Sequence, residues 1–283
     1  MTSSAPGAAQ PSRAARILQG LRLELRRTNF SGRSVSLAEG ALVVATVSSL
    51  GLRSSGRLDA GLLAGVGVLG LADDLLEPRQ RRAGRAVSKG LRGHLGALRT
   101  GRLTTGAAKA LGIPLLTVAG AAAAPGPRAG AMVLADGALA AGCANLANLL
   151  DLRPGRALKV VLPAAVALSA LTPGEDTRAR SGRVLAVAAL VPAALALPAD
   201  LREHGMLGDS GANVLGAAVG TAAARALPVP ARLTLLGVVV ALTLASEKVS
   251  FSAVIDSTPA LRAMDLLGRR ISPVTTGDDG RTP

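Results

Sequence analysis

Aromatic side chains are almost absent from this chain of 283 residues, which has two Phe, no Tyr and no Trp. Proteins that bind single-stranded nucleic acid stack bases on aromatic rings, so the net charge of +14 does not indicate a nucleic-acid partner here. The single cysteine, Cys143, excludes an intrachain disulfide and a cysteine-based zinc site. The two histidines, His94 and His204, are too few and too far apart for a His-rich metal site.

Apolar residues dominate instead: 49% of the chain is hydrophobic and the mean hydropathy is +0.41, which is typical of a membrane protein. Residues 1–36 hold no apolar run long enough for a cleavable signal peptide. The composition predicts an all-α fold, a polytopic membrane helical bundle of about eight transmembrane helices. The predicted spans are 37–52, 58–76, 107–124, 129–150, 158–173, 182–198, 208–225 and 231–247.

Lys and Arg are distributed unevenly over the segments between these spans. If the N-terminus is cytoplasmic, 24 of the 32 basic residues lie on the cytoplasmic side, which predicts a multi-pass protein of the cell membrane with both termini inside. We expect a cytoplasmic tail over 1–28, a membrane domain over 29–269 and a second cytoplasmic tail over 270–283. The basic charge between apolar runs favours membrane lipid or a nucleotide, both of which carry phosphate, as the partner.

Acidic residues stand at the cytoplasmic ends of two predicted spans. Asp73 and Asp74, with Glu77 one turn further on, follow one run, and Asp209 begins another between two glycines. A carboxylate at a membrane helix end is costly and indicates a functional site. Mg²⁺ binds such oxygens together with substrate phosphates, so Asp209 and Asp74 are the predicted metal ligands and Asp73 a catalytic partner. The alternative is that these acids cap helices or pair with arginines.

A third polar segment follows the span that ends near residue 150. The amides of Asn145 and Asn148 and the carboxylate of Asp151 suit the donors and acceptors of a nucleoside. The guanidinium groups of Arg153 and Arg156 suit phosphate oxygens. The alternative is a polar turn that anchors a helix to lipid headgroups.

Residues 89–109 read as a basic cytoplasmic loop, in which Lys89 and His94 are candidate substrate-binding residues. A loop histidine that faces the acids binds phosphate or shuttles a proton. The alternative is that the loop is basic only because basic loops stay in the cytoplasm.

Four motifs in this order resemble the polyprenyl-phosphate N-acetylhexosamine-1-phosphate transferase superfamily, also called glycosyltransferase family 4, over about Asn29 to Arg269. This superfamily includes phospho-N-acetylmuramoyl-pentapeptide transferase and undecaprenyl-phosphate N-acetylglucosamine-1-phosphate transferase. The motifs are Asn29-Phe-Ser-Gly-Arg33, Asp73-Asp-Leu-Leu-Glu77, Asn145-Leu-Ala-Asn-Leu-Leu-Asp151 and Met206-Leu-Gly-Asp-Ser-Gly211.

The resemblance implies transfer of a sugar-1-phosphate from a UDP-sugar donor to polyprenyl phosphate, with Mg²⁺ as cofactor. It implies that Asp209 binds the metal, that Asp73 and Asp74 serve the metal or the lipid phosphate, and that Asn148 and Asp151 hold the nucleoside. The oligomeric state stays open, with a homodimer as one arrangement.

The chain departs from the family pattern in several places. The first membrane helix of the family has no counterpart, the His-rich motif is missing after residue 246, and Arg153-Pro-Gly155 replaces part of the nucleoside segment. Ser36-Leu-Ala-Glu-Gly40 stands where the family has a Pro-Thr-x-Gly-Gly element. A non-catalytic relative and a multi-span transporter or structural membrane protein are therefore the alternatives to an enzyme.

Overall fold

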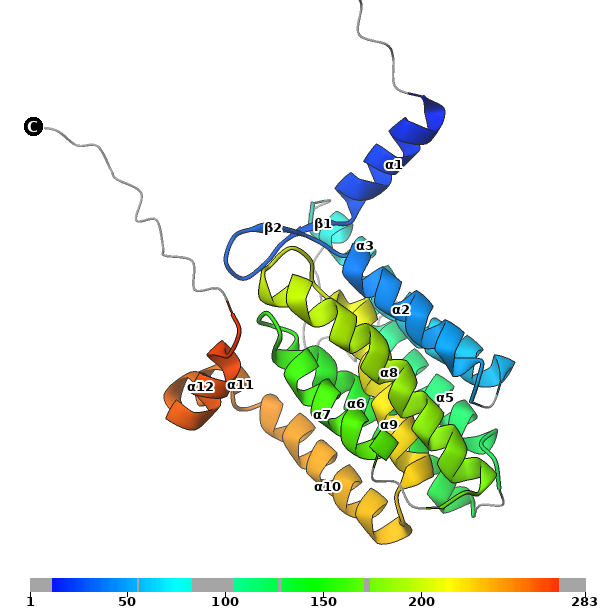
Figure 1. Cartoon of the computed structure of the whole chain (residues 1–283). Helices are drawn as coiled ribbons and strands as arrows, with labels where there is room; N and C mark the ends of the chain where they lie inside the picture. The colour runs from blue at the N-terminus through cyan, green and yellow to red at the C-terminus, as the bar shows by residue number, and fades with distance from the viewer. Residues whose placement is uncertain (1–11, 55, 83–103, 127–128, 171–173, 270–283) are drawn as a thin grey trace, which may run out of the picture.

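The computed structural model describes residues 12–54, 56–82, 104–126, 129–170 and 174–269, and most of these residues are helical (Figure 1). A short antiparallel hairpin, β1 (Arg26–Thr28) and β2 (Ser34–Ser36), follows the first helix, α1 (Arg13–Glu24). The later helices are α2 (Ala38–Gly51), α3 (Arg57–Arg82), α5 (Thr105–Ala122), α6 (Gly130–Leu150), α7 (Arg156–Ala170), α8 (Thr177–Leu201), α9 (Gly208–Ala226), α10 (Val229–Ser246), α11 (Phe251–Ser257) and α12 (Pro259–Leu266).

Each of the eight predicted spans coincides with a helix, but eight membrane crossings are not confirmed. Only α5, α6, α8 and α10 are both long and apolar enough to cross a membrane within the described part of the chain. The other four differ for physical reasons. Helices α2 and α7 have only 14 and 15 residues, α3 carries three acids within its apolar run, and α9 is rich in glycine and polar side chains. The fold is thus a helical bundle with four helices that can span a bilayer.

Helix α9 lies at the centre of the bundle and packs against α2, α3, α6, α7 and α8. Nearly all its residues are small and buried, so neighbouring backbones come very close. A Cβ atom on Gly216 would lie 2.7 Å from the Cα of Ala144 in α6, and one on Gly70 of α3 would lie 2.5 Å from the carbonyl oxygen of Asp209. Glycine at these positions lets three helices meet in direct backbone contact.

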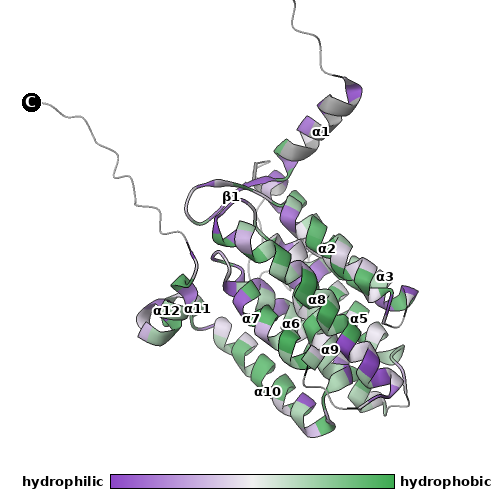
Figure 2. Cartoon of the chain, viewed as in Figure 1, coloured by the Kyte–Doolittle hydropathy of each residue, from purple (hydrophilic) through white to green (hydrophobic). Residues whose placement is uncertain are grey.

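The outward faces of the helices are apolar along much of their length, as Figure 2 shows for α8 and α10. Large exposed side chains there include Leu115, Leu195 and Leu244. A water-soluble protein would cover such surface, whereas lipid solvates it. The apolar exterior agrees with a protein that lies in a membrane.

The hairpin covers the end of the bundle at which α9 begins. The backbone N–H of Met206 donates a hydrogen bond of 3.1 Å to the carbonyl oxygen of Ser36, so β2 runs beside the segment that leads into α9. Helix α1 extends away from the bundle before the hairpin (Figure 1). The hairpin therefore holds the segment that leads into α9 and Asp209.

The close packing of α9 can be tested by comparing the same substitution, glycine to alanine, at two positions with different surroundings. Gly216→Ala should lower the free energy of unfolding by about 1–3 kcal/mol, because the new methyl group meets the backbone of α6. Gly237→Ala on α10 is the matched control: no atom lies within 4 Å of its Cβ position, so it should leave stability unchanged or raise it by up to about 1 kcal/mol. Thermal unfolding in detergent measures both, and equal effects would contradict tight packing at Gly216.

Candidate functional site

Three helices bring two carboxylates and one ammonium group together at this end of the bundle. Lys109, in the second turn of α5, lies with its Nζ atom 2.8 Å from the Oδ2 atom of Asp73 on α3. The same ammonium group forms an ion pair with the carboxylate of Asp209 on α9. The predicted residues Asp73 and Asp209 thus converge on a single cation position.

Asp74 has a different environment from its neighbour in the sequence. Its two carboxylate oxygens accept hydrogen bonds from the backbone N–H groups of Asp209 (3.0 Å) and Ser210 (3.1 Å). Helix α9 has no capping side chain of its own, since Leu207 precedes it, so Asp74 satisfies the first N–H groups of α9 from another helix. Arg27 of the hairpin holds the backbone of Asp74 through a 2.6 Å bond to its carbonyl oxygen. The metal role predicted for Asp74 stays a prediction, and this geometry favours a positioning role.

Further carboxylates surround these residues. Asp200, at the end of α8, is buried and accepts a 2.7 Å hydrogen bond from the N–H of Gly155, while both oxygens of Glu39 are buried without a hydrogen-bond partner in the described structure. Burial raises the pKa of Asp151 well above 3.8, and negative charges raise it further, from Asp200, Asp209, Asp74 and Glu39. This end of the bundle therefore carries more negative charge than Lys109 alone balances.

The amides predicted to bind a nucleoside lie in the last two turns of α6, at the same end as Asp151. Asn145 is exposed and Asn148 is half-buried. Neither side-chain amide forms a hydrogen bond with another described residue, so their donors and acceptors are available to a ligand. The role predicted for Asn145, Asn148 and Asp151 is compatible with this placement.

Arg153 and Arg156 already have internal partners in the structure. Arg153 forms a two-pronged ion pair with Asp256, with distances of 3.0 and 2.7 Å. Arg156 is buried; its Nε atom lies 2.8 Å from the Oδ1 atom of Asp265 and its Nη1 atom donates to the hydroxyl of Ser252. These contacts favour an anchoring role for both arginines over the predicted contact with a substrate phosphate.

Two predicted residues, Lys89 and His94, lie outside the described part of the chain. Three residues in the cluster were not singled out from the sequence: Lys109, Glu39 and Asp200. Lys109 carries a usable signal, because a lone charge inside an apolar helix is costly without a partner. Glu39 and Asp200 look like ordinary polar residues at helix ends, and only their packing reveals them.

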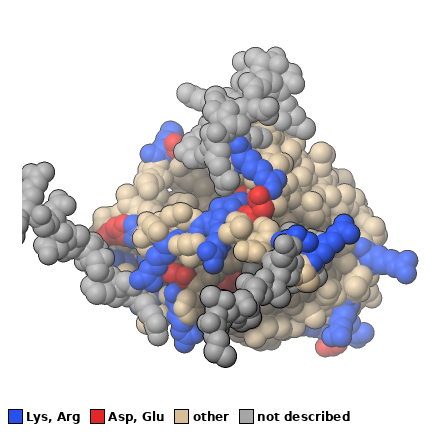
Figure 3. Space-filling view, turned by 90° about the horizontal axis from the view of Figure 1, so that it is seen from above, with Lys and Arg blue, Asp and Glu red and all other residues tan. Residues whose placement is uncertain are grey.

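Figure 3 looks down on this end of the bundle and shows Lys and Arg side chains gathered across it, with acidic groups between them. The hairpin contacts its neighbours through some of these side chains. The Nε atom of Arg33 lies 3.9 Å from a carboxylate oxygen of Glu203. The guanidinium groups of Arg153 and Arg269 both lie over the ring of Phe30, 5.5 and 5.3 Å from its centre. A basic surface around an acidic centre attracts anions to this end of the bundle.

A second polar layer lies near the opposite end of the bundle. Asp59 is about 14 residues before Asp73 on α3, which places it roughly 20 Å away along the helix. It forms a buried two-pronged ion pair with Arg225, at 2.7 Å for both bonds, and Arg232 pairs with Asp136 at 2.8 and 2.9 Å. These ion pairs join α3 to α9 and α10 to α6. Each carboxylate is neutralised by a guanidinium group of a neighbouring helix.

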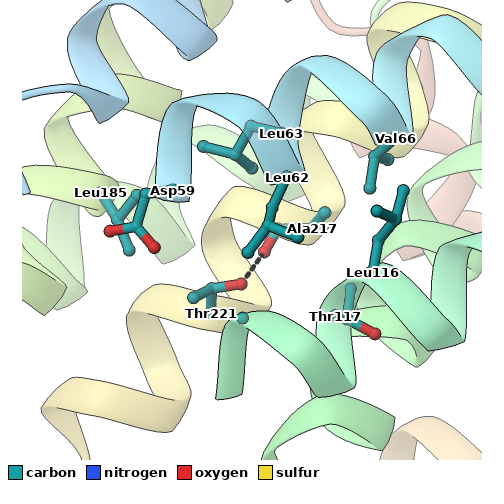
Figure 4. Close-up of a pocket in the computed structure, with 10 residues that line it drawn as sticks. Asp59, Leu62, Leu63, Val66, Leu116, Thr117, Leu185, Ala217 and Thr221 are labelled. Carbon is teal, nitrogen blue, oxygen red and sulfur yellow. Dashed lines mark hydrogen bonds between the residues drawn. The ribbon is translucent and has the colours of Figure 1, made fainter. Parts of the chain in front are cut away.

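A small cavity of about 20 Å³ lies beside this second layer, between α3, α5, α8 and α9 (Figure 4). Its walls are mainly apolar, with Leu62, Leu63 and Leu116. The hydroxyl group of Thr221, which also lines the cavity, donates a 2.7 Å hydrogen bond to the carbonyl oxygen of Ala217. The cavity is separate from the acidic cluster and contains no residue predicted from the sequence to bind substrate.

Comparison with known proteins gives no relative: no family model, no curated protein and no solved structure matches this chain.

The cap on α9 generates a stability prediction. Asp74→Ala should lower the free energy of unfolding by about 1–3 kcal/mol, because two backbone N–H groups at the start of α9 lose their acceptors. Asp74→Asn should recover part of this loss, since the amide retains one acceptor oxygen. The control is Asp176→Asn, where the capping oxygen accepts from Ala179 N–H and an amide caps equally well. If Asp74→Ala unfolds at the wild-type temperature in detergent, Asp74 does not cap α9.

The raised pKa of Asp151 predicts a pH dependence of stability. The folded state holds this proton more tightly than the unfolded state, so the contribution is fully present below the ordinary pKa of 3.8 and is lost as pH rises through the raised pKa. Asp151→Asn should therefore lose less stability than the wild type as the pH rises above about 4. Thermal unfolding across this range tests it. Glu175→Gln, at an exposed acid, should keep the wild-type slope, and a wild-type slope in Asp151→Asn would refute the assignment.

Proposed function

We propose that this protein is a membrane phosphoglycosyl transferase, which moves a sugar-1-phosphate from a UDP-sugar to polyprenyl phosphate at the cytoplasmic membrane face. The observation that carries the proposal is the convergence of Asp73 and Asp209, from two helices, on one cation position at one end of an apolar bundle. The order of the four motifs in the sequence supports the same activity.

The cluster offers a two-carboxylate site for Mg²⁺. Among the described residues, no group of three or more His, Cys, Asp or Glu side chains is placed to hold a metal. Mg²⁺ in phosphoryl-transfer sites is typically held by one or two carboxylates together with water and substrate phosphates, so Asp73 and Asp209 fit this requirement. Bound there, Mg²⁺ supplies the positive charge that stabilises the diphosphate during transfer.

The residues of the chain have distinct parts in this proposal. Asp74 keeps the N-terminus of α9, and with it Asp209, in position through the two backbone N–H groups. With Mg²⁺ bound to Asp73 and Asp209, the half-buried ammonium group of Lys109 would be free to pair with a substrate phosphate. The amides of Asn145 and Asn148 would receive the uracil and ribose of the donor, beside Asp151.

A second candidate is a non-catalytic member of the same group of proteins, and one observation favours it. Lys109 neutralises Asp73 and Asp209 without any metal, and Arg153 and Arg156 are occupied by Asp256 and Asp265. A transporter is less favoured, because transporters place their ionisable groups near the middle of the membrane, whereas these acids cluster at one end of the bundle.

Substitution of the two converging acids tests the proposal. Asp209→Asn and Asp73→Asn should each lower Mg²⁺-dependent turnover by roughly 10²–10³, because each removes one ligand of the charge-stabilising metal. The reaction is measured as transfer of label from a panel of UDP-sugars to undecaprenyl phosphate by purified protein. Asp176→Asn, which changes an acid that caps α8 near its start, should keep wild-type activity.

Binding measurements separate the two candidates. The transferase is supported if the wild type binds Mg²⁺ and UMP and the Asp209→Asn variant has lost its affinity for Mg²⁺. Full activity in Asp209→Asn would show that the metal assignment is wrong. A wild type that turns over no donor and binds neither Mg²⁺ nor UMP would favour the non-catalytic protein.

A further inference from the structure

Helices α11 and α12 form a small element at the side of the bundle. They follow α10 after a connection of four residues, and Figure 1 shows them beside the bundle, near the end of α10 and the start of α7. Helix α10 is one of the four helices able to span a membrane, and it ends at Ser246. The element therefore follows directly after a helix that can span a membrane.

Polar contacts attach this element to the bundle. Asp265 of α12 is only 5% exposed and pairs with Arg156 at the start of α7. Lys159 donates to the backbone carbonyl oxygens of Met264 and Asp265, at 3.1 and 2.6 Å. Asp256 of α11 pairs with Arg153. The face that points toward the protein is thus the charged face.

Several apolar side chains at the end of the element point the other way, whereas Phe251, Ile255 and Leu266 are half-buried. Met264 is 66% exposed and Leu267 is 72% exposed, and Leu261 lies one turn before Met264 on the same helix. Within the described residues, the hydrophobic core contains no residue beyond Val239, so this element contributes nothing apolar to it. A helix in water turns its apolar face inward, so the reversed polarity requires an apolar environment outside the protein.

The apolar surface is continuous with the lipid-facing side of α10. Leu244 near the end of α10, Val249 in the connection and Val254 on α11 are all exposed. Two exposed cations, Lys248 and Arg262, are interspersed with these residues. Together with the bundle residues that hold it, the element carries six basic groups against three acidic ones: Arg153, Arg156, Lys159, Lys248, Arg262 and Arg269 against Glu247, Asp256 and Asp265.

We propose that α11 and α12 form an interfacial membrane anchor, which lies in the plane of the bilayer and inserts Leu261, Met264 and Leu267 between anionic lipid headgroups. Exposed apolar residues next to basic ones are the features by which amphipathic helices bind anionic membranes. Because Arg153 and Arg269 both lie over Phe30, the anchor also connects the lipid surface to the hairpin that covers the acidic cluster. This inference depends on the membrane location and not on the proposed transferase activity.

The lack of Trp and Tyr makes a direct test possible, since one introduced Trp is the only strong fluorophore. Full-length Met264→Trp and Leu267→Trp are reconstituted in lipid nanodiscs that contain phosphatidylglycerol. Lipids brominated near the headgroup should quench their emission, and the emission maximum should lie to the blue of that of Trp in water. Leu195→Trp, on an exposed face of α8, should respond most to bromine placed deep in the acyl chain. Ser31→Trp, at the tip of the hairpin, should respond only to aqueous iodide.

The charge contribution is tested by lipid composition. In Met264→Trp protein, Lys248→Glu with Arg262→Glu should reduce quenching by brominated lipid in anionic nanodiscs, and replacing the anionic lipid with phosphatidylcholine should reduce it in the parent. Quenching of Met264→Trp by iodide and not by brominated lipid would overturn the proposal. Protection from both quenchers would also overturn it, because the face would then be covered by protein, such as a second copy of the chain.

Discussion

The close approach of α9 to its neighbours is the constraint on which the rest of the structure depends. Gly70 on α3 allows that helix to touch the backbone at Asp209, and Gly216 allows α6 to touch the middle of α9. In a bilayer no hydrophobic driving force acts between helices, so association relies on close packing and on buried polar bonds. The small side chains of α9 make the close packing possible. The contact between Gly70 and Asp209 also brings Asp74 within reach of the first N–H groups of α9.

Charge is arranged in two layers that differ in how well it is balanced. In the layer of Asp59 and Asp136, each carboxylate faces a buried guanidinium group, so the charges hold helices together. In the layer of Asp73 and Asp209, one ammonium group serves two carboxylates, and further acids surround them. Carboxylates in excess of their cations are costly for a purely structural purpose. The layer of Asp73 and Asp209 is therefore the stronger candidate for binding a cation with a phosphate substrate.

The same acidic end is connected to the surface through the hairpin. Arg27 bonds to the backbone of Asp74, and Phe30 lies beneath Arg153 and Arg269. The segment around Asn29, the start of α7 and the helices after α10 therefore meet over one region, although they are far apart in the sequence.

The sequence by itself determined where the apolar helices of the bundle lie and which of their ends carry acids, because hydropathy and the positions of charges are properties of neighbouring residues along the chain. It did not indicate the hairpin or helices α1, α11 and α12, which have no long apolar run. It indicated all eight helices of the bundle and placed Asp73, Asp74, Asp209 and Asp151 in one group. Four of those helices are long and apolar enough to span a membrane in the described part of the chain, and the prediction of eight spans is not confirmed. The roles predicted for Lys89 and His94 stay predictions, because both residues lie outside the described part of the chain.

Only the tertiary structure decided which side chains face one another. The pairing of Lys109 with Asp209 joins residues 100 positions apart, and the bond from Asp209 N–H to Asp74 spans 135 positions, so both depend on how each helix is rotated against its neighbours. Local sequence patterns carry no information on that rotation, since Asp73 and Asp74 are identical in type and adjacent in the chain. One turns toward Lys109 and the other caps α9, because successive residues on a helix point in directions about 100° apart.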